Sequence, residues 1–215
     1  MSVRRYLLGC DLAKSMDFTS FAIIDMQWHP EIKVFKYHLQ ALDRIKGVDY
    51  PQICELIIST VEMLEAREIQ AYIKSSPNFA DSGPHLCMDA SGLGAPIKDF
   101  LKGKYFFQQK NRKLWPVVFT GGEAARYDQI TKNYNISKSK IISNFLSLMQ
   151  HGRFDYSPDL AALPLLEEEI QNFQYHATPS GHIGMDAAPG KHDDLICAIC
   201  IPLIIAEWRL TAGYK

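Results

Sequence analysis

The feature that most constrains the fold is an uncharged apolar run near the C-terminus. It extends from Leu195 to Ala206 and follows the stretch "GKHDD", in which Asp193 and Asp194 are adjacent carboxylates. A membrane-spanning helix needs about 20 apolar residues, so this shorter run predicts a helix buried in a protein core. Two carboxylates beside such a core are costly unless another group neutralises them. The pair therefore needs an explanation.

Length and composition are those of one globular domain. The chain has 215 residues, of which 47% are apolar and 22% are charged, close to the averages for such domains. The net charge of −1 lacks the overall basic character of a protein that coats nucleic acid, so any contact with a polyanion must be local.

Five cysteines, mostly in apolar runs and without a preceding signal peptide, indicate a reducing compartment. Cys197 and Cys200 form a single CxxC, which favours buried small residues over zinc or thiol chemistry.

Hydrophobic periodicity predicts an α/β fold with strands before and between helices. Three β-rich runs, 4–12, 18–27 and 31–42, predict an antiparallel meander. The remaining expected elements are a helix at 50–73, buried strands at 84–92 and 114–122 with a short helix at 95–103 between them, a helix at 137–152, a short strand at 153–156, a helix at 158–175 broken near Pro164, a hairpin-like stretch at 177–191 and the last helix.

Four acids stand at the ends of these predicted elements. Asp11 ends the first strand, Asp89 ends the fourth, and Asp193 with Asp194 opens the last helix. If strands one and four are neighbours, the carboxylates meet at one edge of the sheet. Clustered carboxylates repel one another unless a hard cation such as Mg²⁺ or Mn²⁺ lies among them. Two such ions, about 3.5–4 Å apart, stabilise both oxygens of an in-line phosphodiester displacement.

Each acid also has a purely structural explanation. Asp193 could cap the last helix, Asp11 could end a strand at a turn, and Asp89 could brace the "ASGLG" turn. Their joint placement, in the order meander, helix, strand and terminal helix, favours a metal-dependent nuclease. The predicted fold is α/β of the ribonuclease H-like type, with a mixed central sheet that contains an antiparallel three-strand meander and is flanked by helices.

Five segments in order resemble the nuclease domain of the viral DNA-packaging terminase large subunit, of the tailed-bacteriophage type. They are "GCDLAKSMDFTSFAIID", "MDASGLGAPIKDFL", "VVFTGGEAARYD", "ISKSKIISNFLSLMQHGRFDY" and "GKHDDLICAI". The resemblance implies an endonuclease that cuts double-stranded viral DNA concatemers during packaging. It implies that Asp11, Asp89 and Asp194 hold two Mg²⁺ or Mn²⁺ ions, with Asp193 and Asp17 supporting them or binding the second ion.

The resemblance also has limits and implies partners. The full terminase subunit carries an ATPase, but no G-x-x-x-x-G-K-[ST] motif occurs in this sequence. Residues 1–215 are therefore expected to form a single nuclease domain without the motor, either excised or separately encoded. The implied partners are the terminase ATPase domain, the small terminase subunit and the portal, in the cytoplasm of a bacterial host, with no membrane partner.

Local basic residues are candidates for DNA contact. Tracking of phosphates is expected from Lys98, Lys102, Lys104, Lys110, Arg112 and Lys113, and from Lys138 and Lys140 beside a predicted helix N-terminus. The alternative is an ordinary solvated surface. His192 could polarise water, orient a carboxylate or only pack.

Two other functions remain open from the sequence. A junction resolvase or transposase-like nuclease of the same fold would share the acids but would require a dimer or further DNA-binding modules. A non-nucleolytic ATP-binding or interaction domain of related topology would place its strand-end aspartates against phosphates, yet the chain has no second phosphate loop.

Overall fold

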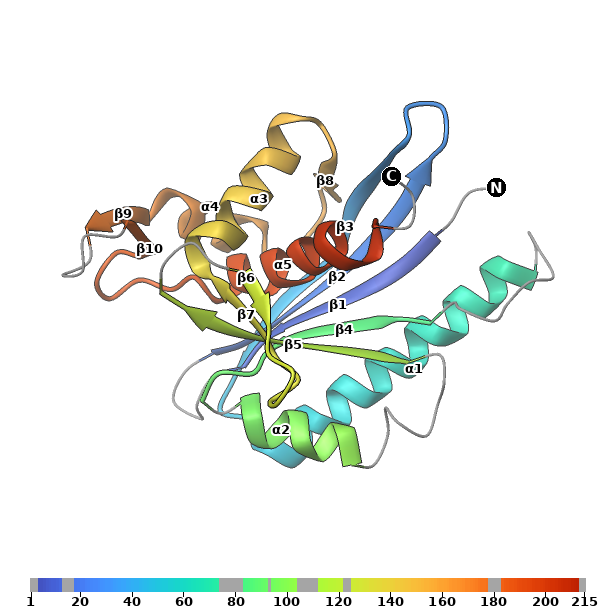
Figure 1. The fold of residues 1–215 in the computed structure, drawn as a ribbon, viewed down its shortest axis with the longest axis horizontal. Helices are drawn as coiled ribbons and strands as arrows, with labels where there is room; N and C mark the ends of the chain where they lie inside the picture. Colours follow the sequence, from blue (N-terminus) through green and yellow to red (C-terminus); the bar gives the residue numbers. More distant parts are fainter. Residues whose placement is uncertain are drawn as a thin grey trace.

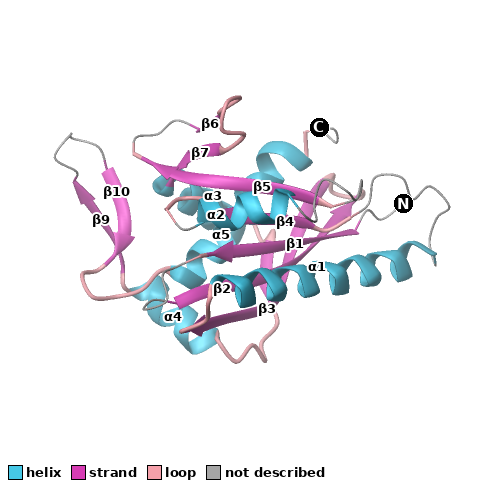
Figure 2. Ribbon diagram, turned by 90° about the horizontal axis from the view of Figure 1, so that it is seen from below, coloured by secondary structure: helices cyan, strands magenta, loops and turns pink. Residues whose placement is uncertain are grey.

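The computed structural model is a mixed sheet with helices on both faces (Figures 1 and 2). It describes residues 4–12, 18–73, 83–92, 94–103, 112–121, 125–177 and 183–212. The strands are β1 (Arg4–Asp11), β2 (Phe18–His29), β3 (Val34–Lys46), β4 (His85–Asp89), β5 (Lys113–Thr120), β6 (Ala125–Tyr127), β7 (Tyr134–Ser137), β8 (Phe154–Tyr156), β9 (Phe173–Ala177) and β10 (Ile183–Ala187). The helices are α1 (Tyr50–Ile73), α2 (Gly94–Leu101), α3 (Lys138–Gln150), α4 (Leu163–Gln171) and α5 (Asp194–Ile205), which continues as the π-helical turn η2 (Ala206–Leu210).

The strand order brings the predicted strand ends together. Within the described residues, one eight-stranded sheet has the order β6-β7-β5-β4-β1-β2-β3-β8, and β9 pairs with β10 in a separate hairpin. The predicted meander is confirmed, because β2 runs antiparallel to both β1 and β3. Strand β4 is parallel to β1, with Cys10 opposite Met88. The next residue of each strand is an aspartate, so Asp11 and Asp89 reach the same edge.

Helices cover both faces of this sheet. Figure 1 shows α1 and α2 on one face and α3, α4 and α5 on the other. A hydrophobic core lies on each face of the sheet, and successive residues of β1 point into different cores. Leu8 packs in the core with α1, and Leu7 packs in the core with α5. Gly9 permits close contact with α5, because a Cβ there would lie 1.9 Å from the Ala198 carbonyl oxygen. Burial of α5 on β1 therefore fixes the helix that begins at Asp194.

The apolar run and the cysteines behave as predicted. Every residue from Leu195 to Ile205 is buried, and all five cysteines are buried free thiols. Burial raises the pKa of the Cys197 and Cys200 thiols well above the usual range, which disfavours their thiolate forms. Among the described helices, none is both long and apolar enough to cross a membrane.

Two local predictions were wrong. Helix α4 begins at Leu163, so Pro164 lies in its first turn, where proline costs no hydrogen bond, and does not break a longer helix. The residues after Gln171 form β9 instead of continuing that helix. Strands β6 and β7 were not predicted, because such short, largely polar segments carry little periodicity and are formed by pairing with β5 and with each other.

Candidate active site

Four carboxylates meet at the carboxyl ends of β1 and β4. Asp11 ends β1, Asp89 ends β4, and Asp193 and Asp194 stand at the start of α5. Burial raises the pKa of the Asp11 carboxyl well above its usual range, and the nearby Asp89, Asp194 and Asp193 carboxylates raise it further. The structure thus brings Asp89, Asp193 and Asp194 near Asp11, whereas the site that these acids are predicted to form and their chemical roles remain predictions.

Asp89 belongs both to the turn after β4 and to the acidic cluster. Its Oδ1 accepts a hydrogen bond of 2.8 Å from the Ser91 N–H. Burial raises its pKa, while the Ser91 hydrogen bonds and the Lys138 charge lower it. Gly94 starts α2 close by, and a Cβ there would lie 1.9 Å from the Asp89 carbonyl oxygen. The turn therefore holds the carboxylate at the sheet edge.

Asp193 does not cap α5, as the structural explanation would require. Its side chain makes no capping hydrogen bond. Instead, Lys138 Nζ donates to its Oδ2 at 2.6 Å, and the Ala187 N–H donates to the same oxygen at 3.2 Å. The Lys138 ammonium is therefore paired with Asp193 beside the acids, and its predicted phosphate contact stays a prediction. Lys138 Nζ also lies 5.9 Å from the ring centre of Phe119.

The hydrogen bonds at the start of α5 come from Glu169, which sequence reasoning missed. Its Oε2 accepts from the Leu195 N–H at 2.9 Å and from the Ile196 N–H at 3.1 Å. No local pattern links a glutamate of α4 to amides so far along the chain. His192 Nδ1 lies 3.4 Å from Asp194 Oδ2, which agrees with the orienting role among those considered for this histidine.

The basic segment from Lys98 to Lys113 does not form one patch. Lys98 is only 7% exposed and donates to Asn133 Oδ1 at 3.1 Å. Arg112 is also 7% exposed and donates to Glu65 Oε2 at 2.9 Å. Both cations are buried, Lys98 in a hydrogen bond to a neutral amide and Arg112 in an ion pair, which corrects their assignment to a DNA-contacting surface.

The other basic candidates lie in separate places. Lys113 starts β5, at the opposite end of the parallel strands from the acids. Lys102 lies near Lys98 and Lys132, whose charges add to the lowering of its pKa by burial. Lys140 is exposed in the first turn of α3. Lys104 and Lys110 lie outside the described residues, as does the predicted metal ligand Asp17.

The acids form an oxygen-donor set that suits a hard cation such as Mg²⁺ or Mn²⁺. In the part of the chain that the structure describes, no three His, Cys, Asp or Glu side chains already form a group that could hold a metal ion. The effect of Asp89, Asp193 and Asp194 on the pKa of Asp11 nevertheless places these three carboxylates within electrostatic reach of Asp11. The donor chemistry therefore fits such a cation, although the ligand geometry is not preformed.

Comparisons with known proteins point to one group. The large terminase subunits of Thermus phage G20c and Thermus virus P23-45 are each 21% identical to this chain over 210 residues, which is 98% of this chain. The chain spans 33% of the length of these curated relatives. No family model matches the sequence.

Solved structures agree with these relatives. The large terminase nuclease from thermophilic phage G20c with bound magnesium matches with a TM-score of 0.55 at 19% identity, covering 94% of this chain and 81% of that one. The human cytomegalovirus terminase nuclease domain matches with a TM-score of 0.52 at 15% identity, covering 98% of this chain and 87% of that one. The chain therefore has the ribonuclease H-like fold of the terminase nuclease domains, as the resemblance in its sequence predicted.

Proposed function

We propose that this chain is a metal-dependent endonuclease domain that cleaves double-stranded viral DNA concatemers during genome packaging. The observation that carries the proposal is the meeting of Asp11, Asp89, Asp193 and Asp194 at one sheet edge. Solved structures of similar fold include the G20c terminase nuclease with bound magnesium and with bound cobalt, which supports the same metal dependence here.

Asp11, Asp89 and Asp194 are the proposed metal ligands, and Asp193 and Asp17 are proposed to support them or to bind the second ion. Two bound Mg²⁺ or Mn²⁺ ions would supply charge stabilisation for the attacking and leaving oxygens of a phosphodiester. The chain itself holds the acids on rigid elements, two at strand ends and two at the start of a buried helix. Lys138 offsets part of their repulsion, because its charge lowers the pKa of both Asp11 and Asp89.

His192 is proposed to orient Asp194 and not to act as a base. Its Nδ1 lies 3.4 Å from the Asp194 carboxylate, and its ring packs edge-on against Phe18 with the ring centres 5.3 Å apart. A ring held between these two groups has its position set by packing. Its expected contribution is to fix a carboxylate rotamer at the cluster.

DNA contact is proposed for the basic residues whose placement allows it. Lys140 is exposed beside the N-terminus of α3, where backbone N–H groups favour phosphate. Lys102 is half-buried and directly follows α2, and Lys113 starts β5 at the end of the strands opposite the acids, so each is proposed to contribute only to an extended path. Affinity of the isolated domain should accordingly be weak and sensitive to salt.

The wider context is likewise proposed from the relatives. Residues 1–215 would act as one nuclease domain together with a terminase ATPase, a small terminase subunit and a portal, in the cytoplasm of the bacterial host. A motor that delivers DNA at high effective concentration would remove the need for tight binding by the nuclease itself.

A plasmid assay tests this function. Supercoiled DNA incubated with the protein and Mn²⁺ should be nicked and linearised, and EDTA should abolish the reaction. Persistent cleavage in EDTA, or no cleavage in Mn²⁺ or Mg²⁺, would contradict the proposal. Preference for a four-way junction over plain duplex would favour the resolvase alternative, and ATP binding without cleavage would favour the ATP-binding alternative.

A further inference from the structure

The first turn of α5 needs hydrogen-bond acceptors from outside the helix. The leading N–H groups of any α-helix have no acceptor within the helix. The residue before α5, Asp193, gives its side chain to Lys138 and the Ala187 amide. The amides of Leu195 and Ile196 are both satisfied by one oxygen of Glu169, at 2.9 and 3.1 Å. A side chain of α4 therefore caps the helix that carries the acids.

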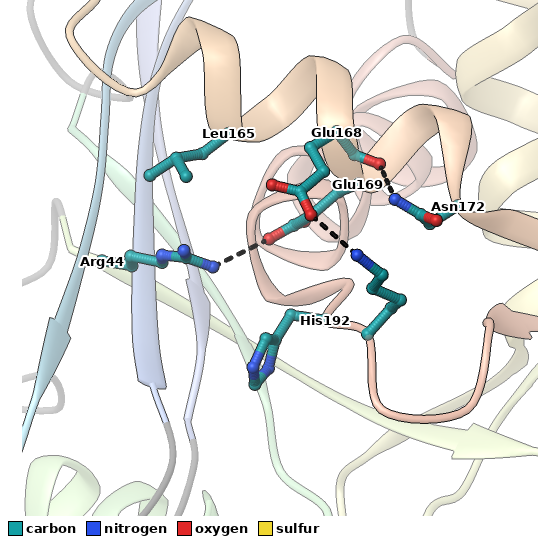
Figure 3. Close-up of a pocket in the computed structure, with 7 residues that line it drawn as sticks. Arg44, Leu165, Glu168, Glu169, Asn172 and His192 are labelled. Atoms are coloured by element: carbon teal, nitrogen blue, oxygen red, sulfur yellow. Dashed lines mark hydrogen bonds and ion pairs between the residues drawn. The ribbon is translucent and has the colours of Figure 1, made fainter.

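Glu169 is itself held in place. It is only 4% exposed, and its second oxygen, Oε1, lies 3.5 Å from Arg44 Nη1 on β3. Figure 3 shows Arg44 reaching from the sheet toward Glu169, and His192 lines the same pocket. The Arg44 guanidinium also lies over the Phe18 ring, 4.3 Å from its centre. The cap thus joins α4, α5 and β3.

A carboxylate is a costly choice at this position. The Asp194 charge adds to the effect of burial in raising the pKa of Glu169 to about 7. A carboxylate close to an acidic cluster increases repulsion in that cluster. Its benefit is geometric, since one oxygen holds two amides at the positive end of the α5 dipole.

We propose that Glu169 is a positioning residue, which caps α5 through Leu195 and Ile196 and thereby sets where the Asp194 carboxylate lies relative to Asp11 and Asp89. This inference rests on the proposed metal-dependent function. Glu169 does not itself bind the metal in this proposal, because its Oε2 is taken by the two amides. Its effect on metal binding passes through the position of Asp194.

The adjacent Glu168 offers a matched control. Its side chain is 57% exposed, and it pairs with Lys191 at 3.0 Å, at the surface of the same pocket. Replacement of Glu168 removes the same chemical group one residue away and leaves the α5 amides bonded. A difference between the two glutamates therefore reports on the cap and not on the charge of α4.

The experiment compares Glu169→Ala, Glu169→Asp, Glu169→Gln and Glu168→Ala in the complete chain. Three measurements are made on each: Mn²⁺ affinity by electron paramagnetic resonance of the free ion, hydrogen exchange of the Leu195 and Ile196 amides, and plasmid nicking. The Ala and Asp variants should lose amide protection and bind Mn²⁺ about 10-fold or more weakly, the scale for groups that orient metal ligands. Glu169→Gln keeps an acceptor oxygen and should restore both properties, and Glu168→Ala should match wild type.

The outcomes separate this inference from the proposed function. Wild-type Mn²⁺ affinity in a folded Glu169→Asp variant would overturn the positioning role, even if Glu169→Ala fails to fold. Equal losses in the Gln and Ala variants would also overturn it, because charge and not the acceptor would then matter. If the wild type neither binds Mn²⁺ nor nicks DNA, the proposed function fails and the positioning role fails with it, while amide exchange still shows whether Glu169 caps α5.

Discussion

The two ends of the parallel strands β1, β4 and β5 differ in which groups surround their buried polar and charged side chains. Toward the amino ends, several buried polar groups have a hydrogen-bond or ion-pair partner of complementary kind, although Glu68 Oε2 has none. The Tyr6 N–H donates to Glu68 at 2.6 Å, Trp115 Nε1 donates to His85 Nδ1 at 2.9 Å, and Arg112 pairs with Glu65 at 2.9 Å. Burial lowers the pKa of His85 to about 3, so its imidazole is neutral and can accept the Trp115 hydrogen bond.

At the carboxyl ends, like charges lie together. Burial and three neighbouring carboxylates raise the pKa of Asp11. Lys138 pairs with Asp193 within the cluster. Such an arrangement costs folding free energy, since each ionised carboxylate raises the cost of ionising the next. The contrast teaches that the amino ends separate their buried charges and pair most of them, whereas the carboxyl ends group like charges, at a cost in stability, where we propose a metal site.

The largest expected effect comes from removing one acid at the carboxyl ends. Asp11→Asn should reduce plasmid nicking by on the order of 10²-fold or more, the scale for deleting one group that stabilises transition-state charge. In metal-free buffer its free energy of unfolding should equal or exceed that of wild type, because one repulsive charge is gone. Urea denaturation and nicking rates measure the two effects.

Nicking at the wild-type rate by a folded Asp11→Asn variant would exclude Asp11 from the site. A marked loss of stability without metal would instead place Asp11 among the structural groups and erase the contrast between the two ends.

A smaller effect is expected for Glu68, whose titration should make the free energy of unfolding depend on pH. Burial raises the pKa of Glu68 from 4.5 to about 7 in the folded protein, so the folded state holds a proton that the unfolded chain releases. This contribution to stability is full below pH 4.5, is lost as the pH rises toward 7 and is absent above. Between pH 5 and pH 8 the wild type should lose on the order of 2 kcal/mol that Glu68→Gln does not lose. Urea denaturation of both proteins at the two pH values measures it, and equal pH dependence would show that Glu68 titrates normally.

The smallest effect is expected for the ion pair of Arg112. Glu65→Ala leaves a buried guanidinium with Glu62 at 3.6 Å, so the domain should lose about 2 kcal/mol, less than for a fully buried pair that loses one partner. Glu62 is the matched control, since its side chain is 53% exposed and its removal should cost no more than about 1 kcal/mol. Nicking should be unchanged in both. Reduced nicking by folded Glu65→Ala protein would mean that the two ends of the sheet are coupled.

Strong periodic segments made most of the fold predictable. The meander, the helix at 50–73 and the buried terminal helix all follow from hydrophobic patterns longer than a few residues. The predicted helix at 137–152 begins after Ser137, whose side chain accepts from the Lys140 N–H at 3.3 Å. Strand β7 escaped prediction because its four residues are defined by pairing with β5. Local pattern is informative only where local preference decides the conformation.

The sequence by itself determined that Asp11, Asp89 and the Asp193–Asp194 pair stand at two strand ends and a helix start, because nearby residues set those ends. Tertiary structure decided that β1 and β4 are neighbours, which brings the strand-end acids to one edge. It also decided which charges neutralise or position the acids. Lys138 pairs with Asp193, Glu169 caps α5, and Arg112 is buried with Glu65 instead of facing DNA. These partners are 55, 26 and 47 positions apart in the chain. Long side chains find partners by the packing of distant elements, and no short stretch of sequence encodes that packing.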